Sequence, residues 1–131
     1  MTEERGVLHV HIQDTPCDSE DFSYYLHVLS QKLNKQPFAL LMDNASIHKS
    51  KEVKPHYAEL NITPVWNVAY SPEFNPIEAV FSKVKRLFNN QRLNNLVNKT
   101  GFNFDREIKS SFRHIKAEHC AACCRKSLFL L

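Results

Sequence analysis

A run of five apolar residues, Phe38-Ala-Leu-Leu-Met42, constrains the fold of this chain more than any other segment. Such a run suits a strand that is buried on both faces, as strands of parallel sheets are. A second short apolar segment, Ile62 to Asn67, follows after a stretch with helical spacing. Parallel strands require a crossover of this kind between them. The order therefore predicts an α/β domain with a sheet that is at least partly parallel.

Helical patterns flank the apolar run on both sides. Before it, Asp18 or Ser19 can cap a helix whose apolar residues recur at helical spacing, namely Phe22, Tyr25, Leu26, Leu29 and Leu33. After it, the pattern that begins at Ser50 contains Pro55, and a proline inside a helix costs a backbone hydrogen bond. This second helix is therefore expected to start late. Pro64 places the strand at Ile62 to Asn67 at a sheet edge, because proline cannot donate to the ladder.

The N-terminal segment Val7 to Gln13 alternates strictly between apolar and polar residues. Strict alternation over several residues is typical of a half-buried strand, so the chain is expected to begin its fold with one. His9 and His11 would share the outer face of that strand. They would then suit either a metal or, more simply, the solvated side of the sheet, since no third ligand is evident.

Two helices are expected in the C-terminal half. Asn75 and Pro76 suit the N-cap and the first position of a helix with an apolar stripe that reaches Phe88. A last helix is expected from about Asp105 through the cysteine cluster. The apolar C-terminus, residues 127–131, is expected to pack on the chain's own core or on a partner.

Length and composition are compatible with one domain of 131 residues and a substantial core. The net charge of +3 is far from the strong basicity of a dedicated nucleic-acid domain, so charge alone does not identify a partner. The N-terminus does not resemble a secretory signal, and no apolar run reaches the roughly 18 residues that a membrane span needs. Three of the four cysteines cluster near one end, which is not a disulfide framework and indicates a reducing, intracellular compartment.

Two acidic residues, Asp43 and Glu78, are the best indication of chemistry. Asp43 directly follows the apolar run, and Glu78 lies in the first turn of the helix that Pro76 begins, with 34 residues between them. Ligands of open α/β sheets gather at the carboxyl ends of the strands. If the two positions meet, their carboxylates can hold the pair of cations that two-metal phosphoryl transfer requires, and Mg²⁺ or Mn²⁺ prefers such oxygen ligands.

Each acid also has a simpler explanation. Glu78 stands three residues after Asn75, where a glutamate completes a capping box, and an aspartate after a strand often begins a turn. The joint occurrence of two motifs favours the chemical interpretation. These motifs are Asp43-Asn-Ala-Ser-Ile-His48 and Tyr70-Ser-Pro-Glu-Phe-Asn-Pro-Ile-Glu78.

With these motifs the chain resembles the Tc/mariner-type transposases of the DDE superfamily, which have an RNase H-like fold. The resemblance is clear over residues 6–90, and residues 91–131 form a C-terminal helical extension to a single truncated RNase H-like domain. It implies that Asp43 and Glu78 are the second and third catalytic acids and ligands of Mg²⁺ or Mn²⁺. It further implies that Asn44 and His48 shape the active-site loop or contact DNA, and Lys49 of the same loop is a further candidate for DNA contact. Apart from the resemblance, the basic residues on or just beyond the Glu78 helix are candidates for contact with a phosphate backbone, namely Lys83, Lys85, Arg86 and Arg92. A solvated charged face is the alternative for the basic residues of that helix.

Members of this family carry a first catalytic aspartate on the first of three antiparallel strands, and this chain is expected to begin at the third strand. The aspartates before Asp43 are Asp14, Asp18 and Asp21, and all follow the alternating segment. The catalytic triad is thus expected to be incomplete. Two strands would also be missing beside Phe38–Met42, so a protein partner, a second copy or a rearranged sheet is expected to satisfy that edge.

Two functions follow from these expectations. The chain is either part of a transposase that cuts and joins DNA with Mg²⁺ or Mn²⁺, inactive alone and nuclear when complete, or a domesticated transposase fold that serves without metal as a structural subunit of an assembly. A third interpretation, a zinc site at His119 and the clustered cysteines, lacks a second clear pair of ligands, and cysteines on a helix are more often small core residues.

Overall fold

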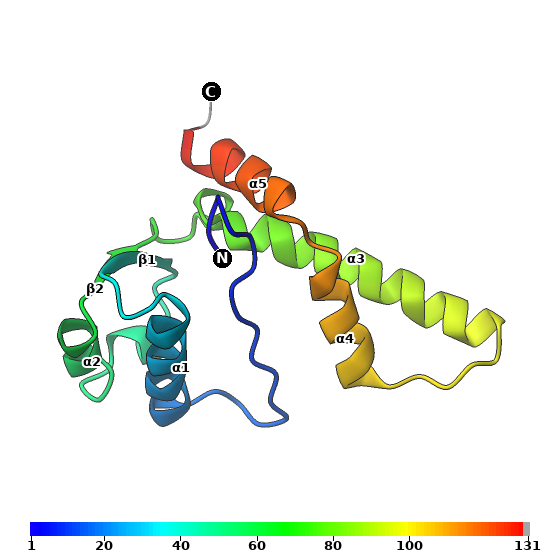
Figure 1. The fold of residues 1–131 in the computed structure, drawn as a ribbon, viewed down its shortest axis with the longest axis horizontal. Coiled ribbons are helices and arrows are strands. Elements are labelled where there is room, and N and C mark those ends of the chain that lie inside the picture. The colour runs from blue at the N-terminus through cyan, green and yellow to red at the C-terminus, as the bar shows by residue number, and fades with distance from the viewer. Residues whose placement is uncertain (130–131) are drawn as a thin grey trace. The chain divides into compact units, whose positions relative to one another are not determined.

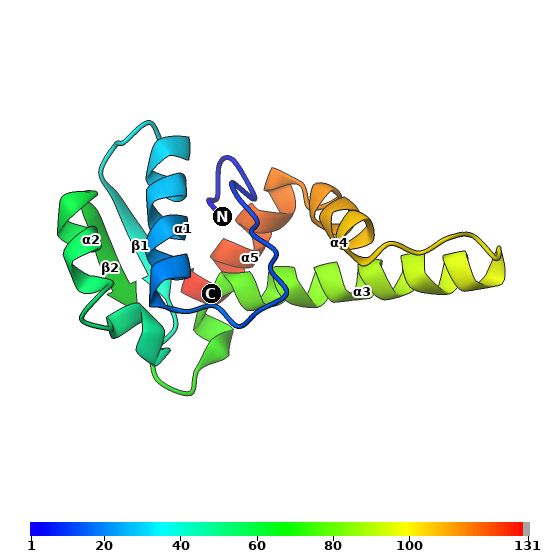
Figure 2. The ribbon, with the colours of Figure 1, turned by 90° about the horizontal axis from the view of Figure 1, so that it is seen from below.

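The computed structural model describes residues 1–129, with side chains to residue 127, and divides the chain into two compact units. The sheet unit is Gln13–Asn75, and the helical unit combines Met1–Ile12 with the chain from Pro76 onward. Both can be followed by colour in Figures 1 and 2. The apolar C-terminus, residues 127–131, was predicted to pack on the core or on a partner. Apart from Ser127, these residues lie outside the described side chains.

The sheet unit confirms the predicted alternation of helices and strands. Its elements are α1 (Ser19–Lys32), β1 (Phe38–Met42), the 3₁₀ turn η1 (Ser46–Lys49), α2 (Lys54–Glu59), β2 (Ile62–Trp66) and the 3₁₀ turn η2 (Pro72–Phe74). The two strands pair in parallel, with Phe38 opposite Ile62 and Met42 opposite Trp66. Pro55 lies in the first turn of α2. Backbone N–H groups in the first turn have no acceptor within the helix, so a proline there costs no hydrogen bond. The predicted late start of this helix is confirmed.

α1 begins where the sequence places it. Asp18 is the N-cap: its carboxylate accepts from the backbone N–H of Asp21 at 2.9 Å. The Asp21 carboxylate in turn accepts from the backbone N–H of Asp18 at 3.2 Å, which completes a capping box. Two of the four unpaired N–H groups at this end of the helix are thereby satisfied.

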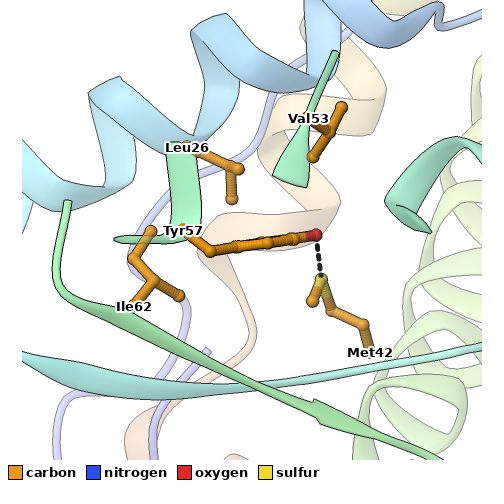
Figure 3. Close-up of a cluster of buried hydrophobic side chains, with 5 residues drawn as sticks. All are labelled: Leu26, Met42, Val53, Tyr57 and Ile62. Carbon is orange, nitrogen blue, oxygen red and sulfur yellow. Dashed lines mark hydrogen bonds between the residues drawn. The ribbon is translucent and has the colours of Figure 1, made fainter. Parts of the chain in front are cut away.

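The core of the sheet unit lies between its helices and its strands. Figure 3 shows Leu26, Val53 and Tyr57 facing Met42 and Ile62 of the two strands, and all five side chains are buried. The Tyr57 hydroxyl lies 3.7 Å from the Met42 sulfur and donates to the backbone carbonyl of His48 at 2.8 Å. A buried hydroxyl needs such a partner, so the core includes one polar group and keeps it satisfied.

The helical unit is built on the long helix α3 (Pro76–Val97), against which α4 (Phe104–Arg113) and α5 (Ala117–Phe129) pack. Pro76 is the first residue of α3, as predicted. The unit buries a cluster of four residues, Val80, Val84, Ile115 and Cys120. No helix within residues 1–129 combines the length and apolar character needed to cross a membrane.

The predicted single C-terminal helix is wrong: the chain forms α4, ends it at the C-cap His114, and begins α5 at Ala117. Ile115, between the two helices, is 6% exposed and lies in the cluster with Val80 and Cys120. The break lets α4 and α5 each pack on α3 while Ile115 fills the core. The sequence has no glycine or proline between α4 and α5, and the helical spacing of apolar residues continues across the break. The break was therefore not predicted.

The predicted strand at residues 7–13 is also wrong. The segment is irregular, and the element nearest to a strand at this end is an isolated bridge between Thr2 and Gly6. A strand exists only through its ladder to a neighbour, and within residues 1–129 the sheet consists of β1 and β2. Val7 instead packs on the apolar cluster of the helical unit. Alternation alone therefore did not distinguish a strand from a segment that lies along helices.

Candidate functional site

Asp43 follows β1 directly, at the carboxyl end of the parallel pair. Its Oδ1 accepts from the backbone N–H of Ala45 at 3.1 Å, the geometry of an Asx turn, and lies 3.0 Å from Nδ1 of His48. The side chain of Asp43 is nevertheless 59% exposed. The turn-forming explanation is thus confirmed, and it leaves the carboxylate within reach of a solvent cation.

His48 is held in place by the core of the sheet unit. Its ring packs on Phe22, with 4.5 Å between the ring centroids, and its side chain is only 18% exposed. Its backbone carbonyl accepts from Tyr57, and burial raises the pKa of Tyr57 to about 12, so this phenol keeps its proton and remains a donor at neutral pH. The core therefore fixes the group that contacts Asp43.

The ends of the two strands are tied together beside Asp43. The amide N–H of Asn67 donates to the carbonyl of Met42 at 2.8 Å, and the Asn44 side chain donates to the carbonyl of Asn67. Lys49 donates to the Asn44 side-chain oxygen, and its ammonium lies 4.7 Å from the centre of the Trp66 ring. We call Asp43, Asn44, His48, Lys49 and Asn67 the carboxyl edge. Four of the predicted site residues meet in it.

The other predicted site residues lie on α3, in the helical unit. Glu78 is exposed in the first turn of that helix. Lys85 and Arg86 are exposed, and Lys83 is half-buried. All four are on one helix, while Asp43 belongs to the sheet unit.

The cysteine cluster does not form a zinc site within the described side chains. Cys120 and Cys124 are buried, and burial raises the pKa of both thiols, which disfavours the thiolate that binds zinc. His119 accepts a hydrogen bond from the backbone N–H of Lys116 through its Nδ1, so it caps the start of α5. Metal-binding side chains do converge elsewhere, at His27, His56 and Glu59.

That second group was missed from the sequence. The spacing of His56 and Glu59, three residues apart on a helix, is a detectable signal because such residues share a face. Nothing in the sequence indicates that His27, on a different helix, lies beside them. Only the packing of α1 against α2 reveals the third member.

Two solved structures resemble this chain in fold. One is the structure of "Mos1 transposase catalytic domain and Raltegravir with Mn", with a TM-score of 0.69, and the other is its counterpart "with Mg", with a TM-score of 0.68. Each is 16% identical to this chain, and the alignment covers 96% of this chain. This chain spans 66% of the length of each solved chain. At this identity the likeness concerns the fold, and it confirms the predicted α/β, RNase H-like class.

Among curated proteins no sequence matches this chain significantly. A family model does match, over residues 1–98, and its description is "DDE superfamily endonuclease". This range covers the carboxyl edge, both strands and the whole of α3. The chain therefore belongs to the DDE superfamily endonuclease family.

Proposed function

We propose that this chain is part of a DDE-type catalytic domain whose complete form cleaves DNA and transfers strands in a metal-dependent reaction. The observation that carries the proposal is the position of Asp43. An exposed carboxylate stands at the carboxyl end of a parallel strand, is oriented by His48, and lies within the range of the family match. That end of the sheet is where α/β proteins place their ligands.

Asp43 and Glu78 are proposed as ligands of Mg²⁺ or Mn²⁺. Both side chains are exposed carboxylates, the donor type that these hard cations prefer. The solved Mos1 domain contains Mn or Mg by its description. When bound, such cations activate the attacking oxygen and stabilise the leaving oxygen of a phosphoryl transfer. The chain's own contribution is to hold Asp43 still through Ala45 and His48.

The aspartates that precede Asp43 are poor candidates for the first catalytic position. Asp18 and Asp21 form the capping box of α1, so their carboxylates already serve the helix. Asp14 lies on an irregular segment before α1 and, unlike Asp43, does not follow a strand. We therefore propose that a polypeptide of these 131 residues is inactive by itself and acts with an aspartate supplied by other residues. A complete transposase would work on nuclear DNA.

The remaining predicted site residues receive two proposed roles. The Asn44 side chain donates to the backbone carbonyl of Asn67, and the His48 ring contacts the Asp43 carboxylate. Both residues are therefore proposed to shape the carboxyl edge. Lys49 and the basic residues of α3, Lys83, Lys85 and Arg86, are proposed to contact DNA phosphates, because phosphate contacts are made chiefly by such cations. We further propose that residues 91–131 are a helical extension of one partial RNase H-like domain.

Metal binding tests the catalytic assignment. In the full chain, Asp43→Asn and Glu78→Gln remove one ligand charge each with little change in volume. We expect each to lower Mn²⁺ affinity at least tenfold, measured by the paramagnetic resonance signal of free Mn²⁺. Glu73→Gln, an exposed acid on η2, serves as the matched control and leaves the affinity unchanged. Unchanged affinity in both test variants would refute the assignment.

A second candidate function is a non-catalytic subunit, whose interaction surface would be an edge of the sheet. Within residues 1–129, β1 has one ladder partner, β2, so its other edge is available for a further strand. Exposed strand edges are the surfaces on which β-augmentation occurs. A partner protein or a second copy is proposed to occupy this edge in either function. Native mass spectrometry of the purified assembly separates them: a fixed protein partner without DNA supports the subunit, and DNA-dependent assembly supports the transposase.

A further inference from the structure

Three side chains of the sheet unit converge at a place that the proposed catalytic function does not use. His27 lies on α1, and His56 and Glu59 lie one turn apart on α2. Nδ1 of His56 is 3.2 Å from Nε2 of His27 and 3.2 Å from Oε2 of Glu59. All three ligand atoms lie within 4.8 Å of one another. Two imidazoles and a carboxylate thus face one small volume.

The distances fit a tetrahedral metal. With Zn–N and Zn–O bonds of about 2.0–2.1 Å, the edges of a zinc tetrahedron are about 3.3–3.4 Å long. Two of the three edges here are 3.2 Å. The third, between His27 and Glu59, is at most 4.8 Å. Because Glu59 is 59% exposed, a rotation of its side chain can close this edge without disturbing the core.

Proton counting also favours a cation. A ring nitrogen carries either one proton or one lone pair, so Nδ1 of His56 cannot both accept from His27 and donate to Glu59. If it is unprotonated, the Glu59 carboxylate faces a lone pair. If it is protonated, His27 and Glu59 must share one proton. A cation at the centre of the group would satisfy all three lone pairs at once.

The group lies at the opposite end of the sheet from Asp43. Glu59 is followed by Leu60 and Asn61, which lead into the start of β2, and the Asn61 carbonyl accepts from Phe38 at the start of β1. A hollow of about 360 Å³ adjoins His27 and Glu59 there and is lined further by Gln31, Lys35 and Asn61. It offers space for a fourth ligand such as water or a small anion.

We propose that His27, His56 and Glu59 form a binding site for a borderline divalent metal, Zn²⁺ in particular, that joins α1 to α2. Imidazole with carboxylate ligation suits Zn²⁺ better than Mg²⁺ or Mn²⁺. Three protein ligands leave one coordination position open toward the hollow. Since the ligands come from both helices, the bound metal fastens the helical layer over the strands and stabilises the sheet unit. The proposal is independent of the catalytic role of Asp43.

The test uses Zn²⁺ alone and the full chain. Competition with a chromophoric chelator is expected to give one Zn²⁺ per chain, and His27→Gln, His56→Gln and Glu59→Gln are each expected to lower the affinity at least tenfold. Glu52→Gln, an exposed acid of the same unit, is expected to leave the affinity unchanged. Absence of Zn²⁺ binding, or binding that none of the three ligand variants weakens, overturns the proposal.

Two further readouts separate this site from the cysteines and from misfolding. Co²⁺ substituted at the site is expected to show ligand-field bands without thiolate charge-transfer absorption; charge transfer would place the metal at the cysteines and overturn the proposal. Zn²⁺ is expected to raise the unfolding temperature of the wild-type chain and of Glu52→Gln, but not of Glu59→Gln. Metal-free circular dichroism spectra that match the wild type show that the variants fold, so a lost response is a lost ligand.

Discussion

The two units bury clusters of similar size but of different chemistry. The cluster of the sheet unit contains Tyr57, whose hydroxyl is bonded to the backbone of His48, and His48 contacts Asp43. The cluster of the helical unit consists of smaller side chains, Val80, Val84, Ile115 and Cys120. The first core is therefore joined to a polar edge with candidate function, whereas the second chiefly holds helices together. A mutation that disrupts the core of the sheet unit is therefore expected to change the position of Asp43.

The largest expected effect is in the core of the sheet unit. Leu26 is fully buried between α1 and the strands, so Leu26→Ala removes apolar contacts and leaves a cavity. We expect the free energy of unfolding to fall by about 2–5 kcal/mol, measured by urea denaturation with circular dichroism. Tyr24→Ala, on the exposed face of the same helix, is the control and should change stability by less than about 0.5 kcal/mol. A loss below about 1 kcal/mol for Leu26→Ala would mean that this cluster is not the core.

In the helical unit, a backbone effect of intermediate size is expected at Gly6. Its φ is +71°, and a Cβ there would lie 3.1 Å from the Cα of Ala117 at the start of α5. Left-handed backbone costs an L-residue about 1–2 kcal/mol, so Gly6→Ala should destabilise the chain by about that amount. Gly101→Ala is the matched control, because a Cβ at that position meets nothing within 4 Å. Equal stability of the two variants would refute the close contact of the N-terminus with α5.

The same contrast explains what the sequence could predict. In the sheet unit the signals are local: the Asp18 cap, the apolar run ending at Met42 and Pro55 each determine structure within a few residues. Both strands, their parallel pairing and the late start of α2 were accordingly predicted. In the helical unit the decisive contacts are distant in sequence. The break at Ile115 depends on Val80 and Val84 of α3, and the irregular path of residues 7–10 depends on helices more than 70 residues away.

The candidate site divides in the same way. Asp43, Asn44, His48 and Lys49 are neighbours in sequence, and they meet at the carboxyl edge as the motif implied. The two histidines of the group formed by His27, His56 and Glu59 are 29 positions apart in the sequence, and this group was not predicted. Periodicity assigned His27 to α1 but carries no information on which side chains of another helix it meets.

A smaller effect tests the claim that the sheet unit depends on local signals. Asp18→Ala removes the N-cap of α1 and should cost about 1 kcal/mol of stability, within a range of about 0.5–2 kcal/mol. Asn103→Ala removes the corresponding N-cap of α4, where the side chain accepts from the N–H of Arg106 at 2.9 Å, and should cost a similar amount. Thermal unfolding of both variants measures this. A negligible effect at Asp18 would show that tertiary packing, rather than the cap, positions α1.

The effect that is smallest at neutral pH concerns Tyr57. Burial raises its pKa from 10.0 to about 12 in the folded chain, so the folded state holds this proton more tightly than the unfolded state does. The resulting contribution to stability is fully present below pH 10 and is lost as the pH rises through about 12. All four tyrosines belong to the sheet unit, so tyrosinate absorbance reports on that unit alone.

A pH titration of this absorbance should therefore contain a late step near pH 12 that disappears in Tyr57→Phe and persists in Tyr24→Phe. The same titration in urea should bring the late step down to the ordinary pKa, because the shift belongs to the folded core. Burial also raises the pKa of Tyr25, so a step near pH 12 that survives in Tyr57→Phe would assign that step to another tyrosine such as Tyr25. The hydrogen bond from Tyr57 to the His48 carbonyl would then not connect a buried core residue to the contact between His48 and Asp43. A step that vanishes only in Tyr57→Phe places Tyr57, the donor to the His48 carbonyl, in the folded core.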